Sequence, residues 1–217
     1  MRQEGVLMII AIDGPAGTGK STVASVLADR LGITFLNSGG FYRTLTKALV
    51  ENGIDFTDEN KTVEFCRRQN ISCVGARFFL NGTDVTDTLH EDSVSSCVAQ
   101  VSAIVPLRHL VNDLMRKATE SMSIVCEGRD MTTVVFPNAD CKVYLDASPE
   151  VRAKRRFDQG VSGMTLEKIK ESIEKRDEID RNKKEGALRI APDALYIDTS
   201  CLTIDNVCDI ILKQIHK

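Results

Sequence analysis

A stretch near the start of the chain has the residue types and spacing of a phosphate-binding loop. Gly14-Pro15-Ala16-Gly17-Thr18-Gly19-Lys20-Ser21, followed by Thr22, fits G-x-x-x-x-G-K-[ST] at every fixed position. Glycines in such a loop let backbone N–H groups turn toward a phosphate, and a helix beginning near Lys20 points its positive dipole end at the same anion. We expect Lys20 to lie between the β and γ phosphates of a bound nucleotide, and the Ser21 hydroxyl to bind Mg²⁺. The alternative is a chance glycine turn before a helix.

Polar side chains that could hold a second anionic substrate follow two later apolar segments. Ser38 and Arg43 come after the segment 34–36, and both can reach an anion near a helix N-terminus. A helix cap at Ser38 with a surface Arg43 is the alternative. Glu127-Gly128-Arg129-Asp130 follows the segment 123–126, at the strand end where doubly wound folds bind ligands. Two acids and an arginine are costly to place there without a ligand, although a structural turn is the alternative.

A third group of charged residues lies toward the C-terminus. Arg176, Asp180 and Lys183 are spaced i, i+4 and i+7, which predicts one face of a helix. An ordinary ion pair on a solvated helix, worth about 0.3–0.5 kcal/mol, explains the spacing equally well. Of the 28 Lys and Arg residues, 11 lie between Arg152 and Lys184, although the net charge is −3. An acidic chain has no general attraction to nucleic acid or anionic lipid. Part of this excess, including Lys168, Lys170 and Lys175, alternates with glutamates as on a solvated helix face, and we expect only the other part, about half, to bind small polyphosphates.

These residues need a sheet whose strands end side by side. The apolar run Val6–Ile12 lacks alternation, which favours a strand covered on both faces. Four more short strands are predicted at Thr34–Leu36, Ser123–Cys126, Cys141–Leu145 and Ala194–Ile197. Helical patterns alternate with them, which predicts an α/β fold with a five-stranded parallel, doubly wound sheet.

An insertion over about residues 62–97 interrupts this rhythm. Within it, Arg77–Leu80, the pair Asn81-Gly82 and Thr83–Val85 predict a β-hairpin with a two-residue turn. The 217 residues otherwise read as one domain, 1–217.

Composition excludes several classes of protein. The longest apolar run is far shorter than the roughly 20 residues that span a bilayer, and it does not resemble a signal peptide. Seven cysteines without a Cys-x-x-Cys pair support neither a zinc ribbon nor a dithiol redox site. We therefore expect a cytoplasmic protein with reduced thiols and no membrane partner.

A phosphate-binding loop alone leaves the reaction open. A GTPase switch needs an Asn-Lys-x-Asp motif, whereas Asn182-Lys183-Lys184-Glu185 has Glu at the last position and lies in a helical pattern. A motor or assembly ATPase usually has a larger chain. A small kinase needs a second site for an acceptor and arginines over the phosphates, which the three groups above could provide.

Taken together, these motifs resemble the bacterial cytidylate (CMP/dCMP) kinase family of P-loop nucleoside monophosphate (NMP) kinases, over nearly the whole chain. Its patterns IDGPxGxGKxT, DSGxxYR, DGRDxxTVVFPxAxxKxxLxA, RDxxD and DAxxIDT are similar to Ile12–Thr22, Asn37–Arg43, Glu127–Ala147, Arg176–Asp180 and Asp193–Thr199. The third pattern is much more specific than a phosphate loop. In that family the insertion is the NMP-binding subdomain.

The resemblance implies a role for each group of residues. Ser38, Arg43 and Arg129 would hold the α-phosphate of the acceptor, with Tyr42 packed beside it. Arg108 and Asp130 would contact the cytosine edge, since an exocyclic amine needs an acceptor and a ring carbonyl needs a donor. The ribose hydroxyls would be held by Arg176 and Asp180, with Lys183 three residues later.

Three residues depart from the family pattern. Ala99 stands where the family commonly has a serine, and Ser102 follows about one helical turn later. Lys183 stands for an arginine and lacks its planar fork. Glu127 replaces an aspartate and reaches one methylene farther.

The expected reaction is magnesium-dependent transfer of the γ-phosphoryl group of ATP to the 5′-phosphate of CMP, and of dCMP as well. Lys20 and Arg129 would be fixed catalytic groups, while Arg152, Arg155 and Arg156 would arrive as a lid over about residues 150–184 closes. The remaining alternatives are another small-molecule P-loop kinase and a GTPase-type switch. From the resemblance and the lack of a coiled-coil pattern we expect a monomer whose partners are small nucleotides.

Overall fold

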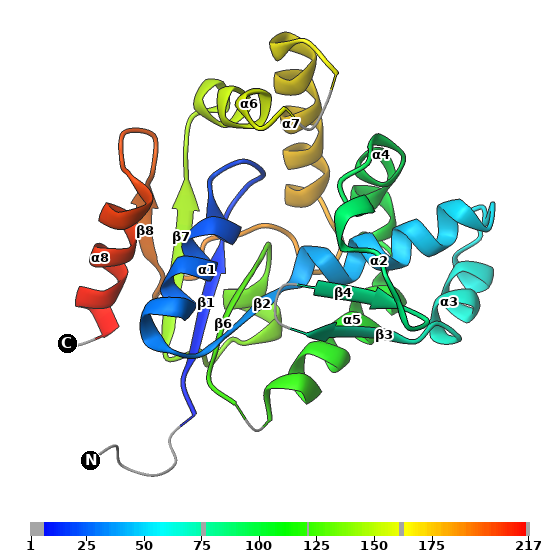
Figure 1. Cartoon of the computed structure of the whole chain (residues 1–217), viewed down its shortest axis with the longest axis horizontal. Coiled ribbons are helices and arrows are strands. Elements are labelled where there is room, and N and C mark those ends of the chain that lie inside the picture. The colour runs from blue at the N-terminus through cyan, green and yellow to red at the C-terminus, as the bar shows by residue number, and fades with distance from the viewer. Residues whose placement is uncertain (1–6, 75–76, 121, 161–162, 216–217) are drawn as a thin grey trace.

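A five-stranded parallel sheet forms the centre of the computed structural model, which describes residues 7–74, 77–120, 122–160 and 163–215 (Figure 1). Its strands are β1 (Ile9–Asp13), β2 (Thr34–Asn37), β6 (Ile124–Gly128), β7 (Cys141–Asp146) and β8 (Leu195–Asp198). Their spatial order is β2-β6-β1-β7-β8. The predicted doubly wound sheet is confirmed. Of the predicted first strand, Val6 lies outside the described residues and the strand itself begins at Ile9.

Helices cover both faces of this sheet. Ile10 and Ile12 point toward α1 (Lys20–Leu31) and α8 (Ile204–Ile215) and are fully buried there. Ala11, between them, joins the second core, beneath α2 (Ser38–Glu51) and α5 (Val105–Thr119). The run of apolar residues lacks alternation because both faces of β1 are inside the protein.

The insertion between α2 and α5 has its own small sheet. Its elements are α3 (Glu59–Arg67), β3 (Ile71–Val74), β4 (Arg77–Leu80), β5 (Thr83–Asp84), the 3₁₀ turn η1 (Thr86–Thr88) and α4 (Asp92–Val101). The predicted hairpin is present as β4 and β5, while β3, which pairs with β4, was not predicted. These elements extend beyond both ends of the expected range of about 62–97.

Phe78 fastens the insertion to the main body. Its ring meets Phe41 of α2 edge on, with 5.4 Å between the ring centroids. A Cβ added at Gly40 would collide with that ring. The glycine therefore lets a strand of the small sheet pack directly against α2.

Two helices, α6 (Pro149–Asp158) and α7 (Leu166–Arg181), stand together beyond the carboxyl ends of the strands (Figure 1). Ala153, Ile169 and Ile173 form a small apolar cluster of their own between them. This cluster is separate from the two main cores. Polar contacts described below also join α6 and α7 to the sheet.

Within the described residues no single helix has the length and apolar composition needed to cross a membrane. The helix pair α4 and α5, bent by 100°, meets those two criteria only when taken together.

Candidate active site

The phosphate-binding loop connects β1 to α1 and turns where only glycine fits. Gly14 has φ +150° and lies so close to the Leu145 carbonyl that a Cβ would collide with it. Gly17 has φ +82°, and a Cβ there would lie 3.0 Å from the Cβ of Arg152. The loop is thus held between β7 and α6, and α1 begins at Lys20 as expected.

The Lys20 ammonium folds back over the loop. It donates to the Pro15 carbonyl at 2.7 Å and to the Thr18 hydroxyl at 3.4 Å. Burial, together with the nearby Arg129 guanidinium, lowers the pKa of Lys20 to about 7. An anion bound in the loop would favour the charged form of Lys20 and so raise its pKa again.

Ser21 and Ser38 both contact Glu127 at the end of β6. The Ser21 hydroxyl donates to Glu127 Oε1 at 3.0 Å, and the Ser38 hydroxyl donates to the Glu127 carbonyl at 2.7 Å. Asn37, not Ser38, caps α2, because its Oδ1 accepts from the Gly40 N–H. The alternative of Ser38 as a helix cap is therefore wrong.

Asp13 positions the segment that follows the β6 end. Its carboxylate accepts from the backbone N–H of Met131 at 2.9 Å, and from the N–H and hydroxyl of Thr132 at 2.8 and 2.6 Å. Burial nevertheless raises the pKa of Asp13 to about 6. These bonds fix the π-helical turn η2 (Met131–Val135) directly after Asp130.

Asp180 is the centre of a buried charge cluster. Arg129 Nε lies 2.8 Å from Asp180 Oδ2, and Lys183 Nζ lies 2.7 Å from Asp180 Oδ1. Arg176 Nε is farther away, at 3.9 Å. Burial opposes ionisation, but the three cations hold the pKa of Asp180 well below its usual value. Because Asp180 is 2% exposed, this is not a pair on a solvated helix.

Lys183 is not on the predicted helical face. The helix α7 ends at Arg181, and the chain then turns back so that the Leu188 N–H donates to the Asp180 carbonyl at 2.8 Å. Lys183 reaches Asp180 from this turn. The helical spacing is thus wrong at its last position, although the expected contact is present.

Arg108 and Asp130 form a second buried ion pair. The Arg108 guanidinium also donates to the Ser102 carbonyl at 2.9 Å and lies 5.8 Å from the centre of the Tyr42 ring. The Tyr42 hydroxyl and Arg108 Nε are buried without a hydrogen-bond partner. Polar atoms left unsatisfied in a buried site are expected where a polar ligand binds.

Gly186 lies against this pair. It has φ +65°, and a Cβ there would collide with both the Arg108 guanidinium and the Asp130 carboxylate. This glycine was not predicted as a site residue, because its only local signal is its place shortly after a charged helix end.

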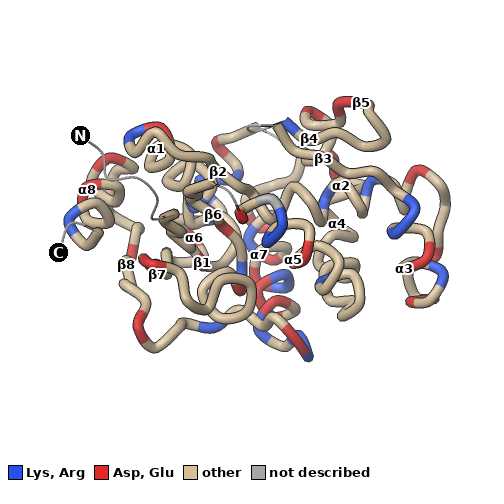
Figure 2. The backbone as a smooth tube through the Cα atoms, turned by 90° about the horizontal axis from the view of Figure 1, so that it is seen from below, with Lys and Arg blue, Asp and Glu red and all other residues tan. Residues whose placement is uncertain are grey.

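Arg43 belongs to α2 and contacts residues of the insertion. It donates to the Leu89 carbonyl at 2.8 Å and to the Ser95 hydroxyl at 2.9 Å. Burial, and then Arg176 and Arg156, lower the pKa of Arg43 to about 9. Burial and Arg129 likewise lower the pKa of Arg176 to about 10. Several guanidinium groups thus lie close enough to disfavour one another's charge, and Figure 2 shows charged residues of both signs around α7.

The three expected lid arginines have different surroundings. Arg152 is buried, pairs with Asp177 at 2.6 Å and donates to the Ala16 and Ala147 carbonyls, both at 3.0 Å. Arg155 donates to the Thr199 carbonyl at 2.6 Å and to its hydroxyl at 3.0 Å. Only Arg156, of these three, lowers the pKa of both Arg43 and Arg176. Arg152 thus contacts the loop directly in this structure. Neither its partner Asp177 nor Thr199, the partner of Arg155, was predicted.

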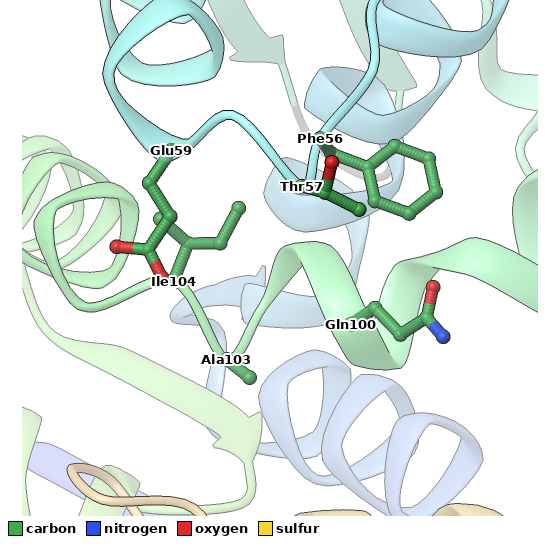
Figure 3. Close-up of a pocket in the computed structure, with 6 residues that line it drawn as sticks. All are labelled: Phe56, Thr57, Glu59, Gln100, Ala103 and Ile104. Carbon is green, nitrogen blue, oxygen red and sulfur yellow. The ribbon is translucent and has the colours of Figure 1, made fainter.

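A pocket of about 260 Å³ lies away from these groups, between the start of α3 and the end of α4 (Figure 3). Its lining residues are Phe56, Thr57, Glu59, Gln100, Ala103 and Ile104. Glu59 is its only ionisable side chain, so the charged residues singled out above are not part of it.

The sheet order β2-β6-β1-β7-β8, with a phosphate-binding loop after the central strand, is the α/β fold of P-loop kinases. The family model described as "Cytidylate kinase" matches residues 10–217. The chain therefore belongs to the cytidylate kinase family.

Individual relatives agree. A cytidylate kinase of Borrelia hermsii (strain HS1 / DAH) is 43% identical over 214 residues, covering 96% of this chain and 98% of the relative. One from Fusobacterium nucleatum subsp. nucleatum is 37% identical, covering 97% and 98%. Among solved structures, an uncharacterized protein from Eubacterium ventriosum has a TM-score of 0.53 at 16% identity, covering 97% and 99%. Shikimate kinase from Bacteroides thetaiotaomicron has 0.50 at 12%, covering 98% and 100%, which supports the fold alone.

Proposed function

We propose that the chain transfers the γ-phosphoryl group of ATP to the 5′-phosphate of CMP, and of dCMP, giving ADP and the cytidine diphosphate. The observation that carries this is the buried Arg108–Asp130 pair. Ser102 and Lys183 connect Arg108 to Asp180, and Arg129, which pairs with Asp180, lowers the pKa of Lys20 in the loop. Family membership supports the same reaction.

The loop residues 14–22 bind the phosphates of ATP in this proposal. Backbone N–H groups of the loop and the N-terminus of α1 face the anion, and Lys20 leaves its internal partners to bind the β and γ phosphates. Arg155 and Arg152 keep the loop in place through Thr199, Thr18 and Ala16.

The acceptor lies across from the loop. Ser38, Arg43 and Arg129 hold its phosphate beside Tyr42, while Arg176, Asp180 and Lys183 hold the ribose hydroxyls. The exocyclic amine of cytosine donates to the Asp130 carboxylate, and the ring carbonyl accepts from the Arg108 guanidinium. Uracil and the purines present a different order of donors and acceptors, which a buried pair discriminates against.

The donor set near the loop suits Mg²⁺. The Ser21 hydroxyl and the Glu127 carboxylate are hard oxygen ligands in contact with each other, as Mg²⁺ prefers when it is shared with substrate phosphates. Bound there, the ion would neutralise charge on the transferred group.

Catalysis then rests on positioning and charge. Phosphoryl transfer passes through a loose transition state with spread charge, which Lys20, Arg129 and Arg156 stabilise. The acceptor oxygen is already anionic near neutral pH, so the reaction needs no general base. The helices α6 and α7 exclude water, which would compete as an acceptor.

The setting follows from the substrates. The insertion, from α3 to α4, acts as the NMP-binding subdomain, and α6 with α7 acts as the lid and acceptor wall. The partners of the enzyme are small nucleotides of pyrimidine metabolism. We place the enzyme in the cytoplasm as a monomer.

An ADP-release assay with ATP and Mg²⁺ across CMP, dCMP, UMP, AMP and GMP tests the proposal. Rapid turnover is expected with CMP and dCMP. Equal rates for all five would contradict the base site. No ADP release with any of the five would favour another small-molecule kinase, and tight GTP binding with slow hydrolysis in the absence of any acceptor would favour a nucleotide switch.

A further inference from the structure

Both oxygen atoms of Ser102, the hydroxyl and the backbone carbonyl, form hydrogen bonds within the protein. No role has been given to this residue so far. It is the residue after α4 and is 7% exposed. Its hydroxyl donates to the Ala99 carbonyl at 3.0 Å and accepts from Lys183 Nζ at 2.9 Å. Its own carbonyl accepts from Arg108 Nη1 at 2.9 Å. One residue thus contacts a group of the proposed base site and a group of the proposed ribose site.

The contact with Lys183 extends into a continuous row of polar groups. Lys183 Nζ lies 2.7 Å from Asp180 Oδ1, and Arg129 Nε lies 2.8 Å from Asp180 Oδ2. The row therefore runs from the end of α4, through the turn after α7, to the residue that follows β6. These three elements come from three separate parts of the chain.

Counting hydrogens shows what this arrangement leaves for a ligand. An ammonium has three N–H donors. Asp180 and Ser102 occupy two of them in Lys183. An ammonium on a flexible stem has no fork of its own to fix its direction, whereas two fixed acceptors do so. The third donor of Lys183 is then aimed in one direction.

We propose that Ser102 is a positioning residue for the acceptor: its hydroxyl aims the third N–H of Lys183 at a sugar hydroxyl, and its carbonyl holds Arg108 against the base. This inference rests on the proposed function. Ser102 also connects two of the departures from the family pattern, because its hydroxyl contacts the Ala99 carbonyl and the Lys183 ammonium.

A simple helix-ending role is the competing explanation, and kinetics separate the two. We expect Ser102→Ala to raise the KM for CMP about tenfold, the effect of losing one hydrogen bond to a charged group. The kcat should change less than about twofold and the KM for ATP not at all, since the bond acts on acceptor binding alone. A structural defect would lower kcat and disturb ATP binding as well.

A double-mutant cycle tests the link to Lys183. Lys183→Met should raise the KM for CMP by itself, and adding Ser102→Ala should raise it no further if the serine hydroxyl acts through the lysine. Additive effects would overturn the proposal.

Two more variants keep the test sharp. Ser102→Cys has nearly the volume of serine and a weaker acceptor, so it should fold and give a smaller rise in KM. Ser96→Ala removes an exposed hydroxyl of α4 whose partners, the Ser93 carbonyl and the Cys97 thiol, both lie in α4, and it should behave as wild type. An unchanged KM for CMP in both Ser102 variants would overturn the inference, while a wild-type enzyme that does not phosphorylate CMP would overturn the proposed function instead.

Discussion

Arg152 and Asp177 form a buried ion pair that contacts both the carbonyl and the N–H of Ala16 in the phosphate-binding loop. Arg152 Nη1 lies 2.6 Å from Asp177 Oδ2 and donates to the Ala16 carbonyl at 3.0 Å. The Ala16 N–H in turn points to Asp177 Oδ1 at 3.4 Å. Because Arg152 belongs to α6 and Asp177 to α7, the position of these two helices is tied directly to the loop.

Asp177→Ala should therefore destabilise the fold and weaken ATP binding. Removing one partner leaves Arg152 buried without a counter-charge, which costs about 3–5 kcal/mol. Urea unfolding measures the stability, and the KM for ATP should rise more than the KM for CMP. Asp158→Ala is a matched control, since Asp158 pairs with Lys154 on the exposed surface of α6 and should contribute less than about 1 kcal/mol. Equal effects of the two variants would contradict the role given to the pair.

Lys20→Ala should lower kcat by at least about 10²-fold, as expected for the loss of one strong electrostatic contact in the transition state. The free enzyme should remain folded and gain stability at neutral pH. The lowered pKa of Lys20 means that the folded state opposes protonation; this penalty is complete below about pH 7 and disappears as the pH rises toward the ordinary lysine value. Steady-state kinetics and thermal unfolding check both statements. Near-normal turnover would refute the assignment of the loop lysine.

ATP binding should take up a proton at about pH 8 but not at about pH 6. With a pKa of about 7, Lys20 is mostly neutral at the higher pH in the free enzyme, and the incoming phosphates favour its charged form. At the lower pH it is already charged. Calorimetry in buffers of different ionisation enthalpy counts the protons, and Lys20→Met should abolish the uptake. Uptake that persists in this variant must come from another group.

Gly186→Ala should raise the KM for CMP while leaving the KM for ATP near its wild-type value. The new methyl group collides with the Arg108 guanidinium and the Asp130 carboxylate, so the base site must shift. Gly53→Ala is the matched control, because Gly53 has φ +60° and open space around its Cβ position. Both variants carry the same backbone strain, and only the first carries the collision. A similar KM for CMP in both would show that Gly186 does not shape the site.

The main sheet could be predicted from the sequence because its residues carry the information locally. Ile9–Asp13 is apolar without alternation, and the phosphate-binding loop follows it at once. By contrast β3, Ile71–Val74, is half exposed and contains a serine and a cysteine, so only its pairing with β4 makes it a strand. A short strand of this kind has little local signal.

The charged residues that the sequence indicated lie near one another in the structure, but their contacts could not be predicted. Lys183 continues a helical spacing, yet α7 ends two residues earlier and the chain turns back on itself. Its partner Ser102 is 81 positions away in the chain. The basic run on α6 likewise does not reveal which arginine points inward, because the burial of Arg152 depends on Asp177 in another helix. Such pairs depend on tertiary packing.

The crowding of like charges in the free site has a consequence for the lifetime of the protein. Burial, and then Arg176 and Arg156, lower the pKa of Arg43, while burial, and then Arg129 and Arg156, lower the pKa of Arg176. A bound polyphosphate removes this repulsion and stabilises only the folded form. When nucleotides become scarce, a larger fraction of molecules opens and is exposed to proteases. The amount of enzyme would then follow the supply of its own substrates.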